Sequence, residues 1–170
     1  MKRLTIEEYR EAEKLPLIVV LDDVRSMYNI GSVFRTCDAF RVEAVYLCGI
    51  CQTPPSTEIH KTALGAEDML DIYSCGDIIF DLKNLKRQGW QIVGLENNID
   101  KPNLVKLNSP EMKEKISDKV VLVLGEEVKG IDYSLYDIID LFVEIPMKGQ
   151  KESFNVSVAA GISVYAIMNL

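Results

Sequence analysis

Six short apolar runs, separated by stretches with helical spacing, constrain the fold of this chain more than any other feature. The clearest run is KVVLVLG at residues 119–125, and LIVVLD at residues 17–22 has the same character. Strands that are apolar without alternation are buried on both faces, which is typical of parallel sheets. The other four predicted strands cover residues 44–49, 69–74, 90–96 and 141–146.

The segments between these strands predict helices that cover the sheet. A charged amphipathic helix is expected at residues 6–14, and IGSVFRTCDAF at residues 30–40 carries apolar residues at helical spacing. A further helix is predicted from residue 77, ending at Gly89. Strands that alternate with helices predict an α/β fold with a mostly parallel sheet and helices on both faces.

The final segment, NVSVAAGISVYAIMNL, predicts an almost wholly apolar helix. Between residues 156 and 170 it carries no charged side chain. A helix that is apolar on all sides is buried on most of them. At the end of a small domain, this pattern favours packing against a partner subunit as well as the sheet. The alternative is a deeply buried terminal helix in a monomer.

Composition and charge fit one folded domain, residues 1–170, without an internal repeat or linker. The chain is 48% hydrophobic and 26% charged, which suffices for a single core. Its net charge of −7 excludes general electrostatic coating of nucleic acid, so a bound polyanion must meet a local basic patch or a partner's surface. No apolar run approaches the roughly 20 residues of a membrane helix, and the charged start lacks a signal segment, so we expect a soluble cytoplasmic protein.

Four cysteines and one histidine limit the possible metal and catalytic chemistry. Cys48 and Cys51 form a CxxC pair, which is compatible with a zinc or redox site, but there is no second pair and His60 is the only histidine. Because Cys48 ends an apolar run, we favour buried small side chains for Cys37, Cys48, Cys51 and Cys75, and no metal ion. Without a GxSxG turn, a serine hydrolase loses its main support, and His60 is expected at the surface.

Polar, glycine-containing segments follow three of the predicted strands, at residues 29–35, 125–130 and 146–155. In open parallel sheets, ligands bind beyond the carboxyl ends of the strands. Glycines let the backbone approach a ligand, asparagines both donate and accept, and a guanidinium holds phosphate or stabilises an oxyanion. Taken singly, each segment also fits a plain turn, a helix cap or a surface ion pair. No phosphate loop or GxGxxG fingerprint is present, which argues against a nucleotide triphosphatase or a nicotinamide dehydrogenase.

Together and in this order, the three segments resemble the motifs of the SpoU family of the SPOUT superfamily. These are RNA ribose 2′-O-methyltransferases that use S-adenosyl-L-methionine. NIGSVFRT is similar to N-x-G-x-x-x-R-T, LGEEVKGI to L-G-x-E-x-x-G-[IL], and IPMKGQKESFNVSVAAGI to I-P-M-x-G-x-x-x-S-L-N-V-S-x-A-x-x-I. The resemblance extends over residues 17–165. It implies a SPOUT-like C-terminal trefoil knot, which general rules of chain connection would not predict, and a homodimer with each site near the interface.

The resemblance also implies roles for individual residues. Cofactor-binding positions, mostly through backbone groups, would be Leu95, Glu96, Gly125, Ile145, Met147 and Phe154. The central catalytic residue would be Arg35, with the ribose and cofactor oriented by Asn29, Glu127, Ser153 and Asn155. Because a guanidinium does not readily lose a proton, we expect Arg35 to stabilise the developing alkoxide or to hold a phosphate. Glu127 is the candidate proton acceptor.

Structured RNA is the substrate that the resemblance predicts, and the minimal length of the chain favours tRNA over rRNA. At a net charge of −7, the RNA must be held by local basic residues, for which the candidates are Arg25, Arg35, Arg41, Lys148 and Lys151. The alternative function is a non-catalytic dimeric RNA-binding or assembly module with the same fold, which would bind no cofactor. A flavin or nicotinamide enzyme has no supporting fingerprint.

Overall fold

Seven parallel strands form one sheet in the computed structural model, which describes residues 4–170. The strand order is β3-β2-β1-β6-β4-β7-β5, and every bonded pair is parallel. Because all strands run the same way, their carboxyl ends lie at one edge of the sheet. The strands are β1 Leu15–Asp22, β2 Val42–Cys48, β3 Ile72–Ser74, β4 Gln91–Leu95, β5 Leu104–Lys106, β6 Val120–Leu124 and β7 Leu141–Glu144.

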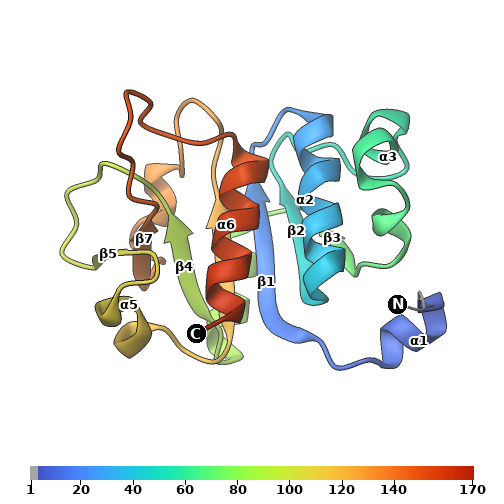
Figure 1. Ribbon diagram of the computed structural model, residues 1–170, viewed down its shortest axis with the longest axis horizontal. Helices are drawn as coiled ribbons and strands as arrows, with labels where there is room; N and C mark the ends of the chain where they lie inside the picture. Colours follow the sequence, from blue (N-terminus) through green and yellow to red (C-terminus); the bar gives the residue numbers. More distant parts are fainter. Residues whose placement is uncertain (1–3) are drawn as a thin grey trace.

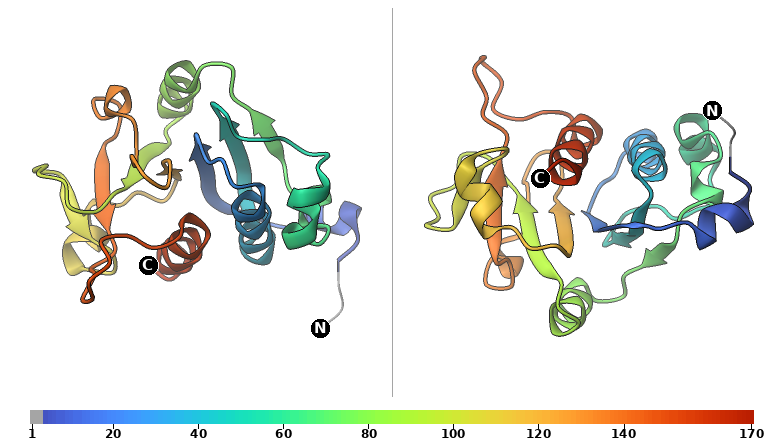
Figure 2. Two further views of the ribbon diagram at one scale, coloured as in Figure 1. Left: turned by 90° about the horizontal axis from the view of Figure 1, so that it is seen from above. Right: turned by 60° about the horizontal axis from the view of Figure 1, so that its bottom comes forward.

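Helices cover both faces of this sheet, which confirms the predicted α/β class (Figure 1). On one face, α2 and α6 lie side by side and α3 flanks α2, while α4 and the 3₁₀ turn η2 lie on the other (Figure 2). The helical elements are α1 Ile6–Glu11, α2 Met27–Phe40, α3 Thr57–Ala63, η1 Ala66–Asp68, α4 Ile78–Arg87, α5 Pro110–Lys115, η2 Tyr133–Leu135 and α6 Val156–Met168. The knotted path of the C-terminal segment stays a prediction.

Strand β1 shows why both faces need a cover. Leu17, Val19 and Leu21 belong to the core cluster under α2 and α6. Ile18 and Val20 belong to the second cluster, under α4 and η2. All five side chains are at most 3% exposed. The continuous apolar run in the sequence therefore reflects alternate residues that enter two separate cores.

The structure contains five elements that the sequence pattern did not predict, namely α3, α5, β5 and the 3₁₀ turns η1 and η2. Helices α3 and α5 form between predicted strands where no helix was predicted, and Ser56 and Ser109 cap them by accepting hydrogen bonds from backbone N–H groups. Strand β5 is three residues long and pairs with the outer edge of β7. The predicted strand at residues 69–74 is wrong in its first half, since only residues 72–74 pair with β2.

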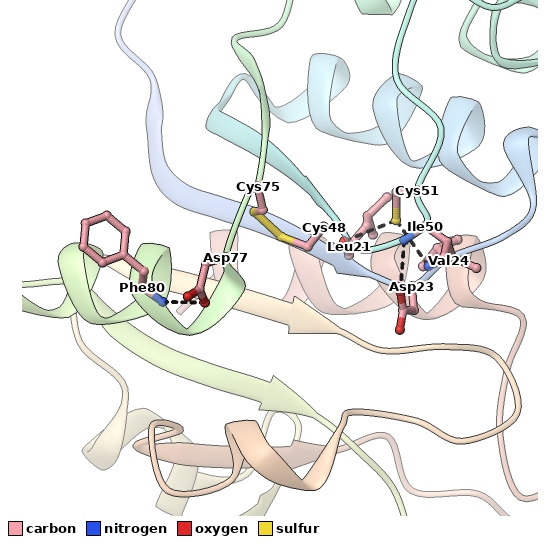
Figure 3. Close-up of a disulfide and its surroundings, with 9 residues drawn as sticks. All are labelled: Leu21, Asp23, Val24, Cys48, Ile50, Cys51, Cys75, Asp77 and Phe80. Carbon is pink, nitrogen blue, oxygen red and sulfur yellow. Dashed lines mark hydrogen bonds between the residues drawn. A yellow bond between two sulfur atoms is a disulfide. The ribbon is translucent and has the colours of Figure 1, made fainter.

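Cys48 and Cys75 form a disulfide that joins the end of β2 to the segment after β3 (Figure 3). In the sheet register, Leu47 lies opposite Ser74, so the residues that follow them, Cys48 and Cys75, lie side by side. Cys37 and Cys48 are buried as predicted, whereas Cys75 is half-buried, and the bond between Cys48 and Cys75 was not predicted. The sequence does not show that β2 and β3 are neighbours.

Cys51 has a structural position rather than a reactive one. Its thiol donates to the Leu21 carbonyl at 3.3 Å and accepts the Val24 N–H at 3.2 Å (Figure 3). Burial raises the pKa of the Cys51 thiol to about 11. The thiol therefore stays protonated near neutral pH and ties the turn after β2 to the end of β1. Among residues 4–170, none of the helices is both long enough and apolar enough to span a bilayer.

Gly31 provides a test of the contact between α2 and α3. A Cβ at this position would collide with the Thr62 hydroxyl and the Ile59 carbonyl of α3. We expect Gly31→Ala to lower the free energy of unfolding by about 1–3 kcal/mol, although alanine favours helices, because the two helices must separate. Denaturant unfolding measures the change. Gly76→Ala, with open space around Gly76, is the control, and a Gly31→Ala variant as stable as this control would contradict the close contact.

Asp22, which is 7% exposed at the end of β1, predicts a pH dependence. Burial, with the nearby charges of Asp23 and Asp132, raises the pKa of Asp22 to about 6. The folded state then holds this proton more tightly than the unfolded state, so its stability contribution falls as the pH rises from about 4 to about 6. We expect Asp22→Asn to raise the free energy of unfolding by up to about 2 kcal/mol at pH 8 and to change it little at pH 4. Equal destabilisation at both pH values would contradict this assignment.

Candidate functional site

A cavity of about 260 Å³ opens at the carboxyl edge of the sheet, the upper edge in Figure 1. It lies where the loops after β4, β6 and β7 meet the first turns of α6. Its volume is near the lower end of small-molecule sites, which are roughly 300–1,000 Å³. The apolar part of its wall includes Leu95, Leu124, Ile145, Val156 and Ala159.

Two glycines shape the loop after β6. A Cβ on Gly125 would collide with the backbone of Gly130, and a Cβ on Gly130, whose φ is +72°, would collide with the carboxylate of Glu96. Glu126 and Gly130 exchange backbone hydrogen bonds of 3.1 and 2.9 Å. The loop is therefore tightly closed at its base, and the residues between Glu126 and Gly130 project around the cavity.

Side chains at the end of β4 hold the other two loops in place. Asn97 Nδ2 donates to the carbonyls of Ile145 at 3.1 Å and Glu152 at 3.2 Å, and its Oδ1 accepts the Ile145 N–H at 3.1 Å. The Glu96 carboxylate accepts the Ile131 N–H at 2.9 Å. The strand that ends beneath the cavity thus fixes the loops after both β6 and β7.

A chain of side-chain hydrogen bonds connects the three motif segments. Asn155 Nδ2 donates to Asn29 Oδ1 at 3.1 Å, and Asn29 Nδ2 donates to Glu127 Oε1 at 3.1 Å. Asn155 also caps α6, because its Oδ1 accepts the Ser157 N–H at 2.9 Å. Because the Asn155 oxygen accepts in this cap, its Nδ2 faces Asn29 and donates to it. The Asn29 oxygen is then used as an acceptor, which leaves its Nδ2 to donate to Glu127. The Glu127 carboxylate is therefore held as an acceptor beside the cavity.

The cavity is rich in negative charge. Four carboxylate residues and one lysine line it, namely Glu96, Glu126, Glu127, Glu152 and Lys129. Two cations approach Glu126: Arg25 Nε lies 3.8 Å and Lys129 Nζ 3.9 Å from its carboxylate oxygens. The remaining carboxylates give the site a net negative field, which favours a ligand that carries positive charge.

The structure brings most of the predicted site residues to this edge. The cavity is lined by Leu95, Glu96, Gly125, Ile145, Phe154, Glu127 and Ser153. Asn29 and Asn155 adjoin it through the hydrogen-bond chain. Met147 does not line it, and Arg35 lies further along α2, in a separate groove between α2 and α3. The catalytic and cofactor-binding roles of all these residues stay predictions.

Of the basic residues predicted to hold RNA, Lys148 and Lys151 are exposed on the loop after β7. Arg25 is exposed and faces Glu126. Arg41 caps the far end of α2, next to the start of β1, and therefore lies at the opposite edge of the sheet. Arg41 is therefore remote from the cavity, because α2 runs antiparallel to the strands, and its contact with RNA stays a prediction.

Sequence reasoning missed Asn97, although a signal for it exists. Two asparagines directly follow a predicted strand at its carboxyl end, where polar side chains often serve a site. His60 lies at the surface as predicted, with its side chain 63% exposed and Nδ1 2.6 Å from Glu67. Within residues 4–170, no group of three or more His, Cys, Asp or Glu residues is placed to hold a metal ion.

Comparison with solved structures agrees with this architecture. A TrmH/SpoU tRNA modifying enzyme from A. aeolicus superimposes with a TM-score of 0.76 at 28% identity, over 96% of this chain and 79% of that one. An AdoMet-bound rRNA methyltransferase from Sinorhizobium meliloti has a TM-score of 0.78 at 24% identity, over 95% of this chain and 59% of that one. At that lower identity the likeness shows the fold alone.

Sequence comparison identifies the family. The chain is 35% identical over 163 residues to the 23S rRNA (guanosine-2′-O-)-methyltransferase RlmB of Nitrosomonas europaea, and 30% identical over 164 residues to RlmB of Pseudomonas aeruginosa. These matches cover 95% and 96% of this chain but only 59% and 63% of the two relatives. The model of the SpoU rRNA Methylase family matches residues 16–165. Because this match spans nearly the whole sequence, the chain belongs to the SpoU methylase family.

Proposed function

We propose that this protein transfers a methyl group from S-adenosyl-L-methionine to a ribose 2′-hydroxyl of structured RNA. The observation that carries the proposal is the chain from Asn155 through Asn29 to Glu127, which unites all three motif segments beside an acidic cavity. The names of the two RlmB relatives favour a guanosine of 23S rRNA as the target. They give no support to the expected preference for tRNA, although the A. aeolicus enzyme is described as tRNA modifying.

The chemistry of the cavity fits this cofactor. Its excess of carboxylates suits a ligand with a positively charged sulfur, and its apolar wall suits an adenine ring. Because Gly125 has no Cβ, the loop after β6 can close against the backbone of Gly130 beneath the cavity. When bound, S-adenosyl-L-methionine supplies a methyl group on a sulfonium. The residues that would hold it are Leu95, Glu96, Gly125, Ile145 and Phe154.

The protein must also orient the ribose hydroxyl and accept its proton. Glu127 is suited to this task, because Asn29 holds its carboxylate at the cavity. The Ser153 hydroxyl lines the same cavity and can orient the ribose. Arg35 lies outside the cavity of its own subunit, which favours a contact with an RNA phosphate over direct stabilisation of the alkoxide.

An exposed apolar stripe on α6 supports a homodimer. Val158, Tyr165 and Met168 are 48%, 58% and 39% exposed. Their spacing of seven and three residues places them on one helix face. The opposite side of α6, which includes Ala160 and Val164, is fully buried in the core. A second copy of this chain would cover the stripe, because contiguous exposed apolar surface marks interaction sites.

Glu127→Gln tests the proposed proton acceptor. We expect kcat for 2′-O-methylation to fall about 100-fold, because the amide cannot take the proton, while affinity for S-adenosyl-L-methionine changes little. Labelled cofactor, rRNA or tRNA and digestion to nucleosides measure the first quantity, and calorimetry the second. Glu152→Gln removes a carboxylate from the same cavity and is the matched control. If both variants retain full activity, Glu127 is not the acceptor.

Two outcomes with the unaltered protein bear on the proposal as a whole. Labelled 2′-O-methyl nucleosides from rRNA or tRNA would support it. If the dimer folds but calorimetry detects no cofactor binding and no methylated nucleoside forms, the non-catalytic RNA-binding module replaces the enzyme.

Val158→Glu tests the homodimer. A charge on the exposed stripe should shift the protein from dimer to monomer in analytical ultracentrifugation, because burying an unpaired carboxylate is unfavourable. Phe80→Glu is the control, since Phe80 is 56% exposed on α4, on the other face of the sheet. If the unaltered chain sediments as a monomer, or if Phe80→Glu dissociates the dimer and Val158→Glu does not, the α6 interface is wrong.

A further inference from the structure

The acidic cavity repels a polyanion such as RNA, so the phosphates of a bound RNA need another surface of the protein. A second groove, of about 460 Å³, lies between α2 and α3 and has the opposite character. Arg35 and Lys61 line it together with the hydroxyl-bearing Ser32, Thr36 and Thr62, and no acidic residue is among its lining. Such a groove suits a phosphate group, since guanidinium, ammonium and hydroxyl groups all donate to phosphate oxygens.

An exposed aromatic ring lies at the end of this groove. Tyr28 is 49% exposed in the first turn of α2. Tyr28, Ser32 and Arg35 are four and three residues apart, which places them on one face of the helix. The Lys61 ammonium lies 5.9 Å from the centre of the Tyr28 ring. An aromatic face beside one cation, with a second cation two turns along the helix, is a combination that suits single-stranded nucleic acid, since bases stack on the ring and phosphates meet the cations.

The backbone of Tyr28 is tied to both helices that form the groove. The Tyr28 carbonyl accepts two hydrogen bonds of 2.9 Å, from the hydroxyls of Ser32 on α2 and Thr62 on α3. At Gly31 the two helices approach so closely that a Cβ would collide with α3. The residue after Tyr28 is Asn29, which belongs to the hydrogen-bond chain at the cavity. The backbone that carries the ring is therefore held in a fixed position next to the proposed reaction site.

We propose that the groove between α2 and α3 binds an unpaired RNA nucleotide that flanks the target ribose. Its base stacks on Tyr28, and its phosphate lies between Arg35 and Lys61. This inference rests on the proposed function and deepens it, because it adds Tyr28 and Lys61 as residues that hold the substrate. It explains how a chain with a net charge of −7 binds RNA without placing phosphates in the acidic cavity.

Substitutions at Tyr28 separate stacking from other roles. The probe is a fluorescein-labelled oligoadenylate of about a dozen nucleotides, bound to the full protein in the presence of S-adenosylhomocysteine. We expect Tyr28→Ala to weaken binding roughly tenfold or more, and Tyr28→Phe to stay within about twofold of the unaltered protein. The matched control is Tyr73→Ala, because Tyr73 is 51% exposed on the edge strand β3 and should not affect binding.

Lys61→Gln provides an independent test that leaves the ring in place. It should weaken oligoadenylate binding several-fold. The slope of the logarithm of the binding constant against the logarithm of the salt concentration should become shallower by about one, because one phosphate contact is lost. In methylation assays, both Tyr28→Ala and Lys61→Gln should raise KM for RNA more than they lower kcat, and leave cofactor affinity unchanged.

Three results would overturn the inference. In the first, Tyr28→Ala binds oligoadenylate as tightly as Tyr73→Ala. In the second, Tyr28→Phe loses as much affinity for oligoadenylate as Tyr28→Ala. In the third, Tyr28→Ala dissociates the dimer, which would make Tyr28 an interface residue. Failure of the proposed function is distinguishable. An unaltered protein that binds oligoadenylate through Tyr28 but methylates neither rRNA nor tRNA supports the groove and contradicts the enzyme.

Discussion

Two side-chain hydrogen bonds, from Asn155 to Asn29 and from Asn29 to Glu127, join segments that are far apart in the sequence. They are possible only because β6 inserts beside β1 in a wholly parallel sheet, so that the start of α2, the loop after β6 and the start of α6 meet at one edge. The cap of α6 also belongs to this network, since Asn155 uses its oxygen for the helix and its amide for Asn29. Helix docking and site geometry therefore depend on the same contacts.

The distribution of charge gives the cavity and the groove different tasks. The cavity over β4, β6 and β7 is lined by four carboxylate residues and favours a cationic ligand. The groove between α2 and α3 is lined by Arg35 and Lys61 and favours an anion. Separate sites of opposite sign suit a reaction between a sulfonium and a polyanion. They would also account for the proposed use of RNA by an acidic chain, because the phosphates would meet the groove and not the cavity.

The sequence alone predicts those parts of the structure that local pattern determines. Continuous apolar runs predict β1 and β6, and the three motif segments are placed correctly at the carboxyl ends of strands. The disulfide between Cys48 and Cys75, the edge strand β5 and the clamp made by Asn97 depend on which strands lie side by side. Strand order is a tertiary property, so no local pattern reveals it. Likewise, helical spacing places Arg35 on α2 but does not show that its side chain lines a groove away from the cavity.

The central claim is that the loops after β4, β6 and β7 form the binding site for the methyl donor. A crystal structure of the protein with S-adenosyl-L-methionine tests it most directly. The account predicts ligand density bounded by Leu95, Gly125 and Ile145, with the bonds of Asn97 and Glu127 to their present partners retained. Density for the ligand at any other place, or a cavity that stays empty at saturating ligand, would contradict it.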